Sequence, residues 1–232
     1  MKKKSFLQKC WKWIKRIFIF LFIAQLAYII LLKWVNPPIT FTQLSSWIGG
    51  HGFKKDYVGS DNISINAKLS FMASEDQLFP DHNGFDFKSI KKAMKHNRKS
   101  KSLHGASTIS QQTAKNVFLW QGRSWVRKGL EVYFTFMIEL VWGKKRILEV
   151  YMNVAETGKG IFGIEAAAQK YFNKPAKNLA RSEAAQIAAC LPNPKRFTVK
   201  PLSVRMASRS VWIMHQMQNL DEDPDIQILI RQ

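Results

Sequence analysis

A long apolar stretch near the N-terminus is the clearest hydrophobic pattern in the chain. All but two residues between Ile17 and Leu32 are apolar, and Trp34 and Val35 extend the stretch over residues 17–35. At 1.5 Å per helical residue, about 19 residues are just enough to cross a hydrocarbon core of roughly 30 Å. The pattern therefore predicts one transmembrane helix over 17–35, after a basic tail over 1–16.

The rest of the chain is patterned for helices. Apolar residues recur at steps of three and four, as one buried helix face requires, and no run alternates strictly as a strand would. These positions are Leu130, Phe134, Met137, Ile138 and Val141; Ile147, Tyr151 and Val154; and Ile164, Ala167, Ala168, Tyr171 and Phe172. A further helix is expected over 182–190, before Pro192 and Pro194. We predict a mainly α-helical domain over 67–220.

The composition of three other segments predicts their structural roles. Residues 36–66 contain prolines and several glycines, and we read them as a linker with little regular structure. Residues 221–232 are acidic and contain a proline, which indicates a peripheral tail. Residues 132–142 are too short for a second span and contain Glu139, so a buried core helix is favoured over a face that dips into the bilayer interface.

Charge around the apolar stretch predicts its orientation. Seven basic residues precede Ile17 and only Lys33 follows closely, which places the N-terminus in the cytoplasm and the main domain outside it. A cleaved signal peptide is the alternative, but residues 36–39 offer no small-x-small cleavage site. We expect a retained single-pass anchor, and we expect no nucleic-acid partner.

The basic excess limits the class of ligand. The chain has 36 Lys and Arg against 16 Asp and Glu, a net charge of +20, and the part beyond residue 35 is itself strongly basic. Such a charge suits anionic lipid head groups or pyrophosphate-bearing substrates. Cys10 and Cys190 flank the apolar stretch on opposite sides, so we read both as free thiols without a metal role.

A concentration of polar residues begins at Glu75 and ends at Asn116. It contains a carboxylate pair, a histidine, two adjacent amides and a lysine, which packing alone seldom requires. The residues are Glu75, Asp76, Phe79, His82, Gly84, Phe85 and Asp86, then residues 105–112 (GASTISQQ), Lys115 and Asn116. This pattern is typical of an active site.

These blocks resemble the first two motifs of the peptidoglycan glycosyltransferases of family 51, whose lysozyme-like domain polymerises lipid II into glycan strands. The resemblance continues in order through Arg127, Lys128 and Glu131, then residues 144–153, then residues 163–172, and covers roughly 68–198. Five ordered blocks are far more specific than one short motif. The resemblance implies a helical, lysozyme-like domain, and its short C-terminal remainder implies a monofunctional enzyme.

The resemblance assigns the general base to Glu75, which would activate the 4-hydroxyl of the N-acetylglucosamine of incoming lipid II. Apolar neighbours raise a carboxyl pKa toward the range that a base needs at neutral pH. Asp76 would orient its neighbours by hydrogen bonding, and Phe79 belongs to the same motif. His82 fits a substrate site and a buried structural histidine equally well. A solvated helix end is the alternative for the acidic pair.

Cations at helical spacing suit a pyrophosphate. Gln111, Gln112 and Lys115 can share one helix face. Arg123, Arg127 and Glu131 are spaced by four, which could also mean two surface ion pairs worth roughly 0.2 to 0.5 kcal/mol each. In the functional interpretation Lys115, Arg123 and Arg127 bind the donor pyrophosphate. Glu131 would assist the leaving group.

The sequence requires no cofactor, and it contains no metal-ligand cluster that fixes a site. A carboxylate that faces a pyrophosphate is repelled unless a cation intervenes, so Mg²⁺ or Mn²⁺ at the pyrophosphate is the cation to consider beside Glu131.

Further residues match the motifs with weaker roles. Thr108 and Asn116 could contact substrate, whereas Glu149, Tyr151 and Asn153 are expected to brace the fold. Leu130 stands where some members of the family have a basic residue, which puts one acceptor contact in doubt. The candidates for an apolar entry surface for the lipid are Phe118, Leu119, Trp120 and Trp125.

Three alternatives remain beside a transferase that releases undecaprenyl diphosphate. A lytic transglycosylase would cut glycan and would not need the cations. A membrane-anchored module could bind anionic polymers without catalysis. A bifunctional penicillin-binding protein is disfavoured, because Ser89-x-x-Lys92 has no accompanying motifs. The expected partners are lipid II, the growing glycan, the membrane and cell-wall synthesis proteins, at a bacterial inner membrane.

Overall fold

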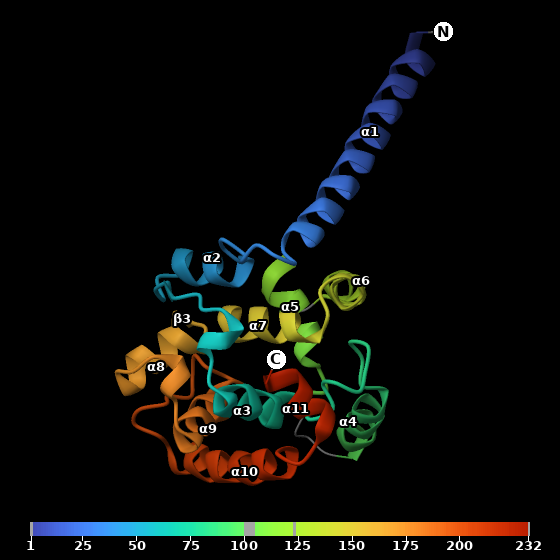
Figure 1. The fold of residues 1–232 in the computed structure, drawn as a ribbon. Coiled ribbons are helices and arrows are strands. Elements are labelled where there is room, and N and C mark those ends of the chain that lie inside the picture. Colours follow the sequence, from blue (N-terminus) through green and yellow to red (C-terminus); the bar gives the residue numbers. More distant parts are fainter. Residues whose placement is uncertain (1, 100–104, 123, 232) are drawn as a thin grey trace. The chain divides into compact units, whose positions relative to one another are not determined.

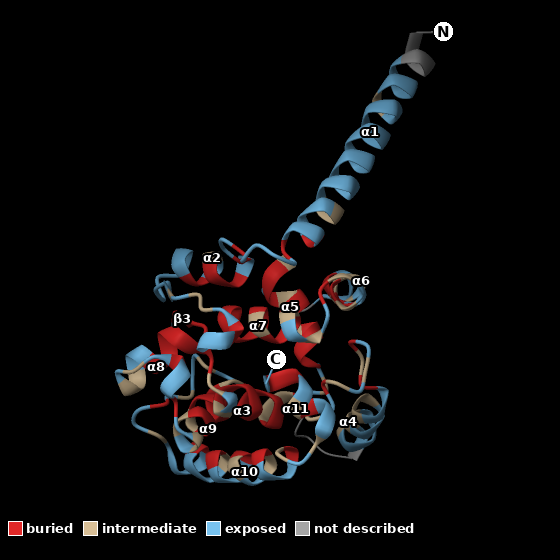
Figure 2. Ribbon diagram, in the orientation of Figure 1, coloured by how far each residue is buried: buried red, intermediate tan, exposed pale blue. Residues whose placement is uncertain are grey.

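The structure is a computed structural model that describes residues 2–99, 105–122 and 124–231. It divides into two compact units, Met1–Asn36 and Pro37–Gln232. The first unit is built on one helix, α1 (Lys2–Leu31), which includes most of the expected basic tail and residues 17–31 of the apolar stretch. Within α1, Phe6–Leu31 is long and apolar enough to cross a membrane. Large apolar side chains are exposed all along it (Figure 2), which suits lipid surroundings.

The second unit is mainly helical, as the sequence pattern predicts (Figure 1). Its described elements are α2 (Phe41–Ile48), β1 (Lys54–Lys55), η1 (Ser60–Asn62), α3 (Ile65–Glu75), α4 (Phe87–Lys99), α5 (Ile109–Phe118), α6 (Trp125–Val141), α7 (Lys144–Val154), β2 (Glu156–Gly158), β3 (Ile161–Phe162), α8 (Ile164–Phe172), η2 (Ala176–Asn178), α9 (Arg181–Cys190), α10 (Val204–Leu220) and α11 (Pro224–Arg231). The small sheet has the order β1-β3-β2, with β1 parallel and β2 antiparallel to β3.

Helix α3 forms the centre of the core. Residues 67–73 are all buried, and the helix packs against α7, α9, α10 and α11. Ala184, Ala185, Ala188 and Ala189 are fully buried along α9, where small side chains allow close approach of its neighbours. The C-terminal end of α3 is thereby fixed where the acidic pair begins.

Two segments are more regular than their composition suggests. In the expected linker, α2 begins with a capping box in which Thr40 and Gln43 bond each other's backbone N–H. The expected peripheral tail contains α11, whose Ile226 and Ile230 are buried and whose Ile230 carbonyl accepts a 3.1 Å bond from the buried Lys68. Pro224–Arg231 is therefore more regular and more buried than its composition suggests, because Ile226, Leu229 and Ile230 share one buried helix face.

Helix α6 buries polar side chains that the hydrophobic pattern did not predict. Its buried side chains are Arg127, Glu131, Thr135 and Ile138, whereas Phe136 and Leu140 are 59% and 70% exposed. The prediction of a buried apolar core helix over 132–142 is wrong for this face. The polar face is buried because it lines the candidate site described next.

Candidate active site

Glu75 is the last residue of α3, and its two carboxylate oxygens face different elements. Oε2 accepts a 2.8 Å hydrogen bond from Nε2 of Gln112 on α5, and Oε1 accepts a 3.0 Å bond from the Ser74 hydroxyl. The Tyr151 hydroxyl on α7 donates to Oε1 of Gln112 at 3.1 Å. This bond fixes which end of the Gln112 amide points at Glu75. Burial and the charges of Glu75 and Asp76 raise the pKa of Tyr151, so its hydroxyl stays protonated and remains a donor.

Asp76 joins the end of α3 to the start of α5. Its buried carboxylate accepts a 2.9 Å bond from the Ile109 N–H and lies 3.0 Å from Nε2 of His82. Nδ1 of His82 accepts from the Gly84 N–H at 3.2 Å, so these partners assign the ring proton to Nε2. A carboxylate at a helix N-terminus is also favoured by the helix dipole. Asp76 and His82 therefore position the elements that carry the site.

Thr108, Gln111 and Gly84 hold the first turn of α5 in place. Thr108 and Gln111 form a capping box, and the Thr108 hydroxyl also lies 2.7 Å from the Gly84 carbonyl. Gly84 has a φ of +86°, and a Cβ there would lie 2.8 Å from Cγ2 of Thr135. Phe79 is fully buried, with the Lys144 ammonium 4.6 Å from its ring centre. These motif residues pack in the core and cap α5, and little of their surface is accessible to a ligand.

Lys115 lies between the two glutamates of the site. Desolvation lowers the pKa of its ammonium, while the charges of Glu131 and Glu75 act in the opposite direction. Among the described residues, no hydrogen bond or ion pair engages the ammonium. A half-buried cation without a partner is costly unless an anion binds beside it.

Glu131 is buried between two cations of its own helix. Its Oε2 is 2.7 Å from NH1 of Arg127, and its Oε1 is paired with the Lys128 ammonium. The Nε atom of Arg127 is buried and has no hydrogen-bond partner within the described part of the chain. A cavity of about 290 Å³ opens beside Arg127 and Lys128. Arg123, the remaining predicted cation of this stripe, lies outside the described residues.

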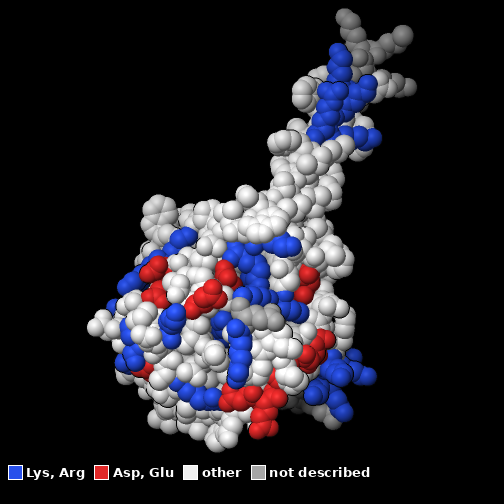
Figure 3. All heavy atoms as spheres, viewed as in Figure 1, with Lys and Arg blue, Asp and Glu red and all other residues white. Residues whose placement is uncertain are grey.

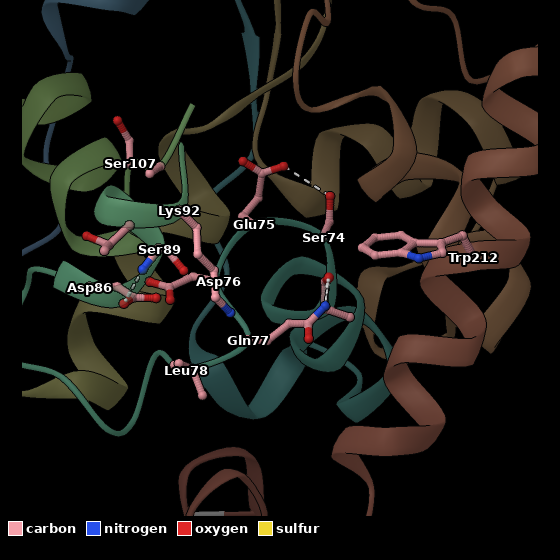
Figure 4. Close-up of a pocket in the computed structure, with 13 residues that line it drawn as sticks. Ser74, Glu75, Asp76, Gln77, Leu78, Asp86, Ser89, Lys92, Ser107 and Trp212 are labelled. Carbon is pink, nitrogen blue, oxygen red and sulfur yellow. Dashed lines mark hydrogen bonds between the residues drawn. The ribbon is translucent and has the colours of Figure 1, made fainter. Parts of the chain in front are cut away.

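A second cavity, of about 380 Å³, opens on the other side of Glu75 (Figure 4). Its lining includes Glu75 and Ser74 from α3, Ser89 and Lys92 from α4, and Trp212 from α10. Figure 4 shows Trp212 on the Ser74 side of Glu75 and Lys92 near Ser89. Glu75 therefore lies within electrostatic range of Lys115 on α5 and also lines a mixed polar and aromatic cavity formed with α4 and α10.

Arg209 was not predicted as a site residue, and its contacts bring α10 to the site. Its NH2 is 3.1 Å from the Ser74 hydroxyl and 4.0 Å from Oε1 of Glu75. Tyr151 was expected only to brace the fold and in fact also bonds Gln112. Glu149 and Asn153 do brace it, since they accept hydrogen bonds from the backbone of Ser60 and Val58.

The remaining sequence candidates lie apart from Glu75 or are covered. Asn116 is buried on α5, and Leu119 is buried just after that helix. Phe118 stacks on Phe134 with ring centres 4.6 Å apart. Trp120 and Trp125 are exposed, as an apolar entry surface would require.

Comparison with known proteins agrees with this geometry. The sequence profile of the family described as "Transglycosylase" matches residues 42–218. A biosynthetic peptidoglycan transglycosylase of Shigella boydii is 50% identical over 224 residues, covering 89% of this chain and 92% of the relative. Proteins of the same description from Yersinia pseudotuberculosis and Escherichia coli are 51% and 56% identical, covering 92% and 80% of this chain and 92% and 78% of those relatives. The chain therefore belongs to the transglycosylase family.

Proposed function

We propose that this chain is a peptidoglycan glycosyltransferase that joins lipid II units into β-1,4 glycan strands, with Glu75 as the general base. The observation that carries the proposal is the arrangement around Lys115. Lys115 is half-buried and unpaired among the described residues, and the charges of Glu75, Arg127 and Glu131 all act on it. This arrangement suits substrates that place a sugar hydroxyl near the Glu75 carboxylate and a diphosphate near the cations Lys115 and Arg127.

Two neutral groups donate hydrogen bonds to the Glu75 carboxylate, and the Arg209 guanidinium lies 4.0 Å from its Oε1. The two donors are Gln112 and Ser74, and the Glu75 side chain is 13% exposed, so an acceptor hydroxyl can still reach a free lone pair. In the reaction Glu75 takes the proton of the acceptor 4-hydroxyl, and the oxygen attacks C1 of the donor N-acetylmuramic acid. The bond from C1 to the diphosphate breaks with inversion, and its electrons leave on undecaprenyl diphosphate. A positioned base of this kind typically contributes about 10² to 10⁴ in rate.

Lys115, Arg127 and Lys128 neutralise the negative charge of the departing diphosphate. The guanidinium of Arg127 has a buried Nε with no bond to another described residue, and Lys115 has no ion pair there, so both have donors left for phosphate oxygens. Glu131 holds Arg127 and Lys128 in place until the diphosphate arrives. Arg123 is proposed to join them on sequence grounds alone.

The described residues contain no group of three or more His, Cys, Asp or Glu side chains placed to hold a metal. Both oxygens of Glu131 are engaged by Arg127 and Lys128. The donor set therefore does not fit a resident Mg²⁺ or Mn²⁺ ion, and we derive no step through one.

The other motif residues are assigned positioning roles. Asp76 and His82 fix the start of α5 against the end of α3, and Thr108 with Gln111 caps the same helix. Phe79 and Asn116 are buried beside them and are proposed to shape the substrate cleft. Gln112 has a direct role, because it holds the catalytic carboxylate.

We further propose that α1 anchors the enzyme in a bacterial inner membrane. The candidate span Phe6–Leu31 supports a single-pass anchor. The basic residues that precede Ile17 favour a cytoplasmic N-terminus, with the catalytic unit on the opposite side. Figure 3 shows Lys and Arg side chains gathered on the described N-terminal part of α1.

The proposal is tested by incubating the detergent-solubilised full chain with labelled lipid II and separating the products on a gel. A ladder of polymer that muramidase digests is expected. Preformed glycan strands are offered in a parallel reaction. If they are shortened while lipid II stays unpolymerised, the enzyme is a lytic transglycosylase and the proposal is wrong.

A further inference from the structure

Ser74 lies where three helices meet beside the proposed base. It is the last residue but one of α3, and its hydroxyl oxygen is 3.0 Å from Oε1 of Glu75 and 3.2 Å from the Ala188 carbonyl oxygen on α9. From α10, NH2 of Arg209 donates to the same hydroxyl oxygen at 3.1 Å. Figure 4 shows the bond between Ser74 and Glu75. One hydroxyl therefore joins the base to two neighbouring helices.

The Ser74 hydroxyl has two possible acceptors but only one proton. A hydroxyl donates one hydrogen bond and accepts up to two, so Ser74 can donate to Glu75 or to Ala188 but not to both at once. Because Arg209 fills one lone pair of the oxygen, the proton is directed toward one of these acceptors. An ionised carboxylate is the stronger acceptor, and the Ala188 carbonyl already accepts from the Leu191 N–H at 3.2 Å. The proton therefore faces Glu75 while that residue is ionised.

The other oxygen of Glu75 has a partner that cannot reverse its hydrogen bond. Nε2 of Gln112 can only donate, and the Tyr151 hydroxyl bonds Oε1 of the same amide, which keeps Nε2 turned toward Oε2 of Glu75. A proton on Oε2 would make that oxygen a poorer acceptor for a donor that cannot turn away. A proton on Oε1 meets no such conflict, because Ser74 can turn its own proton to Ala188 and accept from Glu75. The geometry therefore favours Oε1 as the oxygen that holds the proton.

We propose that the Ser74 hydroxyl is a reversible hydrogen-bond partner of the base and that Arg209 is the positioning residue that holds this hydroxyl. In the proposed reaction, Oε1 of Glu75 takes the proton of the acceptor 4-hydroxyl, and the carboxylate becomes a neutral acid. The Glu75 O–H then donates to the Ser74 oxygen, whose proton turns to the Ala188 carbonyl. Water takes the proton from Glu75 after the product leaves, and the hydrogen bonds return to their first arrangement. The inference rests on the proposed function, since it concerns the base of that reaction.

Arg209 reaches the base through Ser74. Its NH2 is 4.0 Å from Oε1 of Glu75, which is beyond hydrogen-bond distance, but 3.1 Å from the Ser74 oxygen. A second link between α3 and α10 runs from Nε2 of Gln77 to Oε1 of Gln216 at 3.3 Å. Removal of the Arg209 guanidinium should therefore free the Ser74 hydroxyl while α10 stays beside α3.

The test is a double-mutant cycle on the polymerisation of labelled lipid II by the full detergent-solubilised chain. Ser74→Ala is expected to lower kcat about tenfold and to leave KM within about twofold of wild type, because the hydroxyl bonds the base, whereas cations on α5 and α6 bind the diphosphate. Arg209→Met keeps the length of the side chain and should lower kcat about threefold. The double variant should be no slower than Ser74→Ala alone, since Arg209 acts through the hydroxyl.

Three further variants separate this role from a structural one. Ser74→Thr keeps the hydroxyl and should bring kcat to within about threefold of wild type. Ser70→Ala is the matched control on α3, because Ser70 lies one turn earlier and its hydroxyl donates to the Ala67 carbonyl at 3.0 Å. Arg205→Met is the control for the loss of a positive charge on α10, because Arg205 is exposed one turn before Arg209. Both controls should keep the wild-type kcat.

Several outcomes would overturn the proposal. If the losses of the two single variants multiply in the double variant, Arg209 acts on Glu75 independently of Ser74. A Ser74→Ala enzyme with the wild-type kcat would mean that the base needs no reversible partner. A fall in kcat that only follows the folded fraction in thermal unfolding would mean that the contact is structural. If wild type makes no polymer, the proposed function fails and this inference fails with it, whereas each of the other outcomes overturns the inference alone.

Discussion

The hydrogen bond from Tyr151 to Gln112 gives the most specific prediction about the base. The Tyr151 hydroxyl is fully buried and donates at 3.1 Å to Oε1 of Gln112, whose Nε2 donates at 2.8 Å to Glu75. In Tyr151→Phe the ring and its packing stay, but nothing then fixes the orientation of the amide. Gln112 can turn its oxygen toward Glu75, where two acceptors would face each other.

The size of the effect follows from that geometry. A buried acceptor that loses its partner costs about 1–3 kcal/mol, so the melting temperature should fall by roughly 2–4 °C for each kcal/mol in a unit of this size. An orientation preference weakened by 1–2 kcal/mol corresponds to a factor of about 5–30 in population. We therefore expect kcat to fall by a factor in that range, with a smaller change in KM.

The assay follows polymer formation from labelled lipid II at saturating substrate and records thermal unfolding in parallel. Tyr171→Phe is the control, because Tyr171 is half-buried on α8 and has no part in the Gln112 hydrogen bonds. A Tyr151→Phe enzyme with a lowered melting temperature and an unchanged kcat would refute the reasoning. It would mean that the hydroxyl stabilises the fold and does not orient the base.

Three further predictions concern the cations and the start of α5. Glu131→Gln should lower kcat on the order of a hundredfold, since Arg127 and Lys128 lose the charge that holds them; a near-normal rate would mean that Glu131 only pairs with them. Because burial lowers the pKa of Lys115, KM for lipid II should rise with pH at a lower pH than an ordinary lysine would give, as the ammonium loses its proton. Lys115→Arg should flatten that rise, and an unchanged profile would exclude Lys115 as its cause. Gly84→Ala should lower the free energy of unfolding by about 1–3 kcal/mol in chemical denaturation, because φ is +86° and the new Cβ would overlap Thr135. Gly59→Ala is the control, because there is open space around Gly59. Equal stability of the two variants would contradict the predicted clash.

Local patterns in the sequence group the candidate base with several of its neighbours. Glu75, Asp76 and His82 lie within eight residues of one another, and Gln112 and Lys115 share one turn of α5. The apolar period likewise predicts α7, and the residues that begin and end the segment 182–190 predict α9; Ile147, Tyr151 and the alanines of α9 are all buried. The helical class and the family follow from such short-range information.

Long-range contacts could not be found in this way. Arg209 reaches Ser74 across 135 positions of the chain, and no period or motif connects them. The face of α6 was predicted wrongly because the side that carries Arg127 and Glu131 is buried against the site, where ion pairs replace apolar packing. A hydrophobic pattern assumes that the buried face is the apolar one, and an active-site helix does not obey that rule.

The central claim is that Glu75 is the general base of lipid II polymerisation, and Glu75→Gln tests it most directly. The amide keeps the size of the side chain but cannot accept a proton at neutral pH. Glu222→Gln serves as the control, because Glu222 is an exposed carboxylate near the C-terminus. The measurement compares single-turnover polymerisation with lipid II binding for both variants and wild type. We predict that Glu75→Gln binds lipid II and makes no polymer, while Glu222→Gln matches wild type. Polymerisation by Glu75→Gln at the wild-type rate would contradict the account.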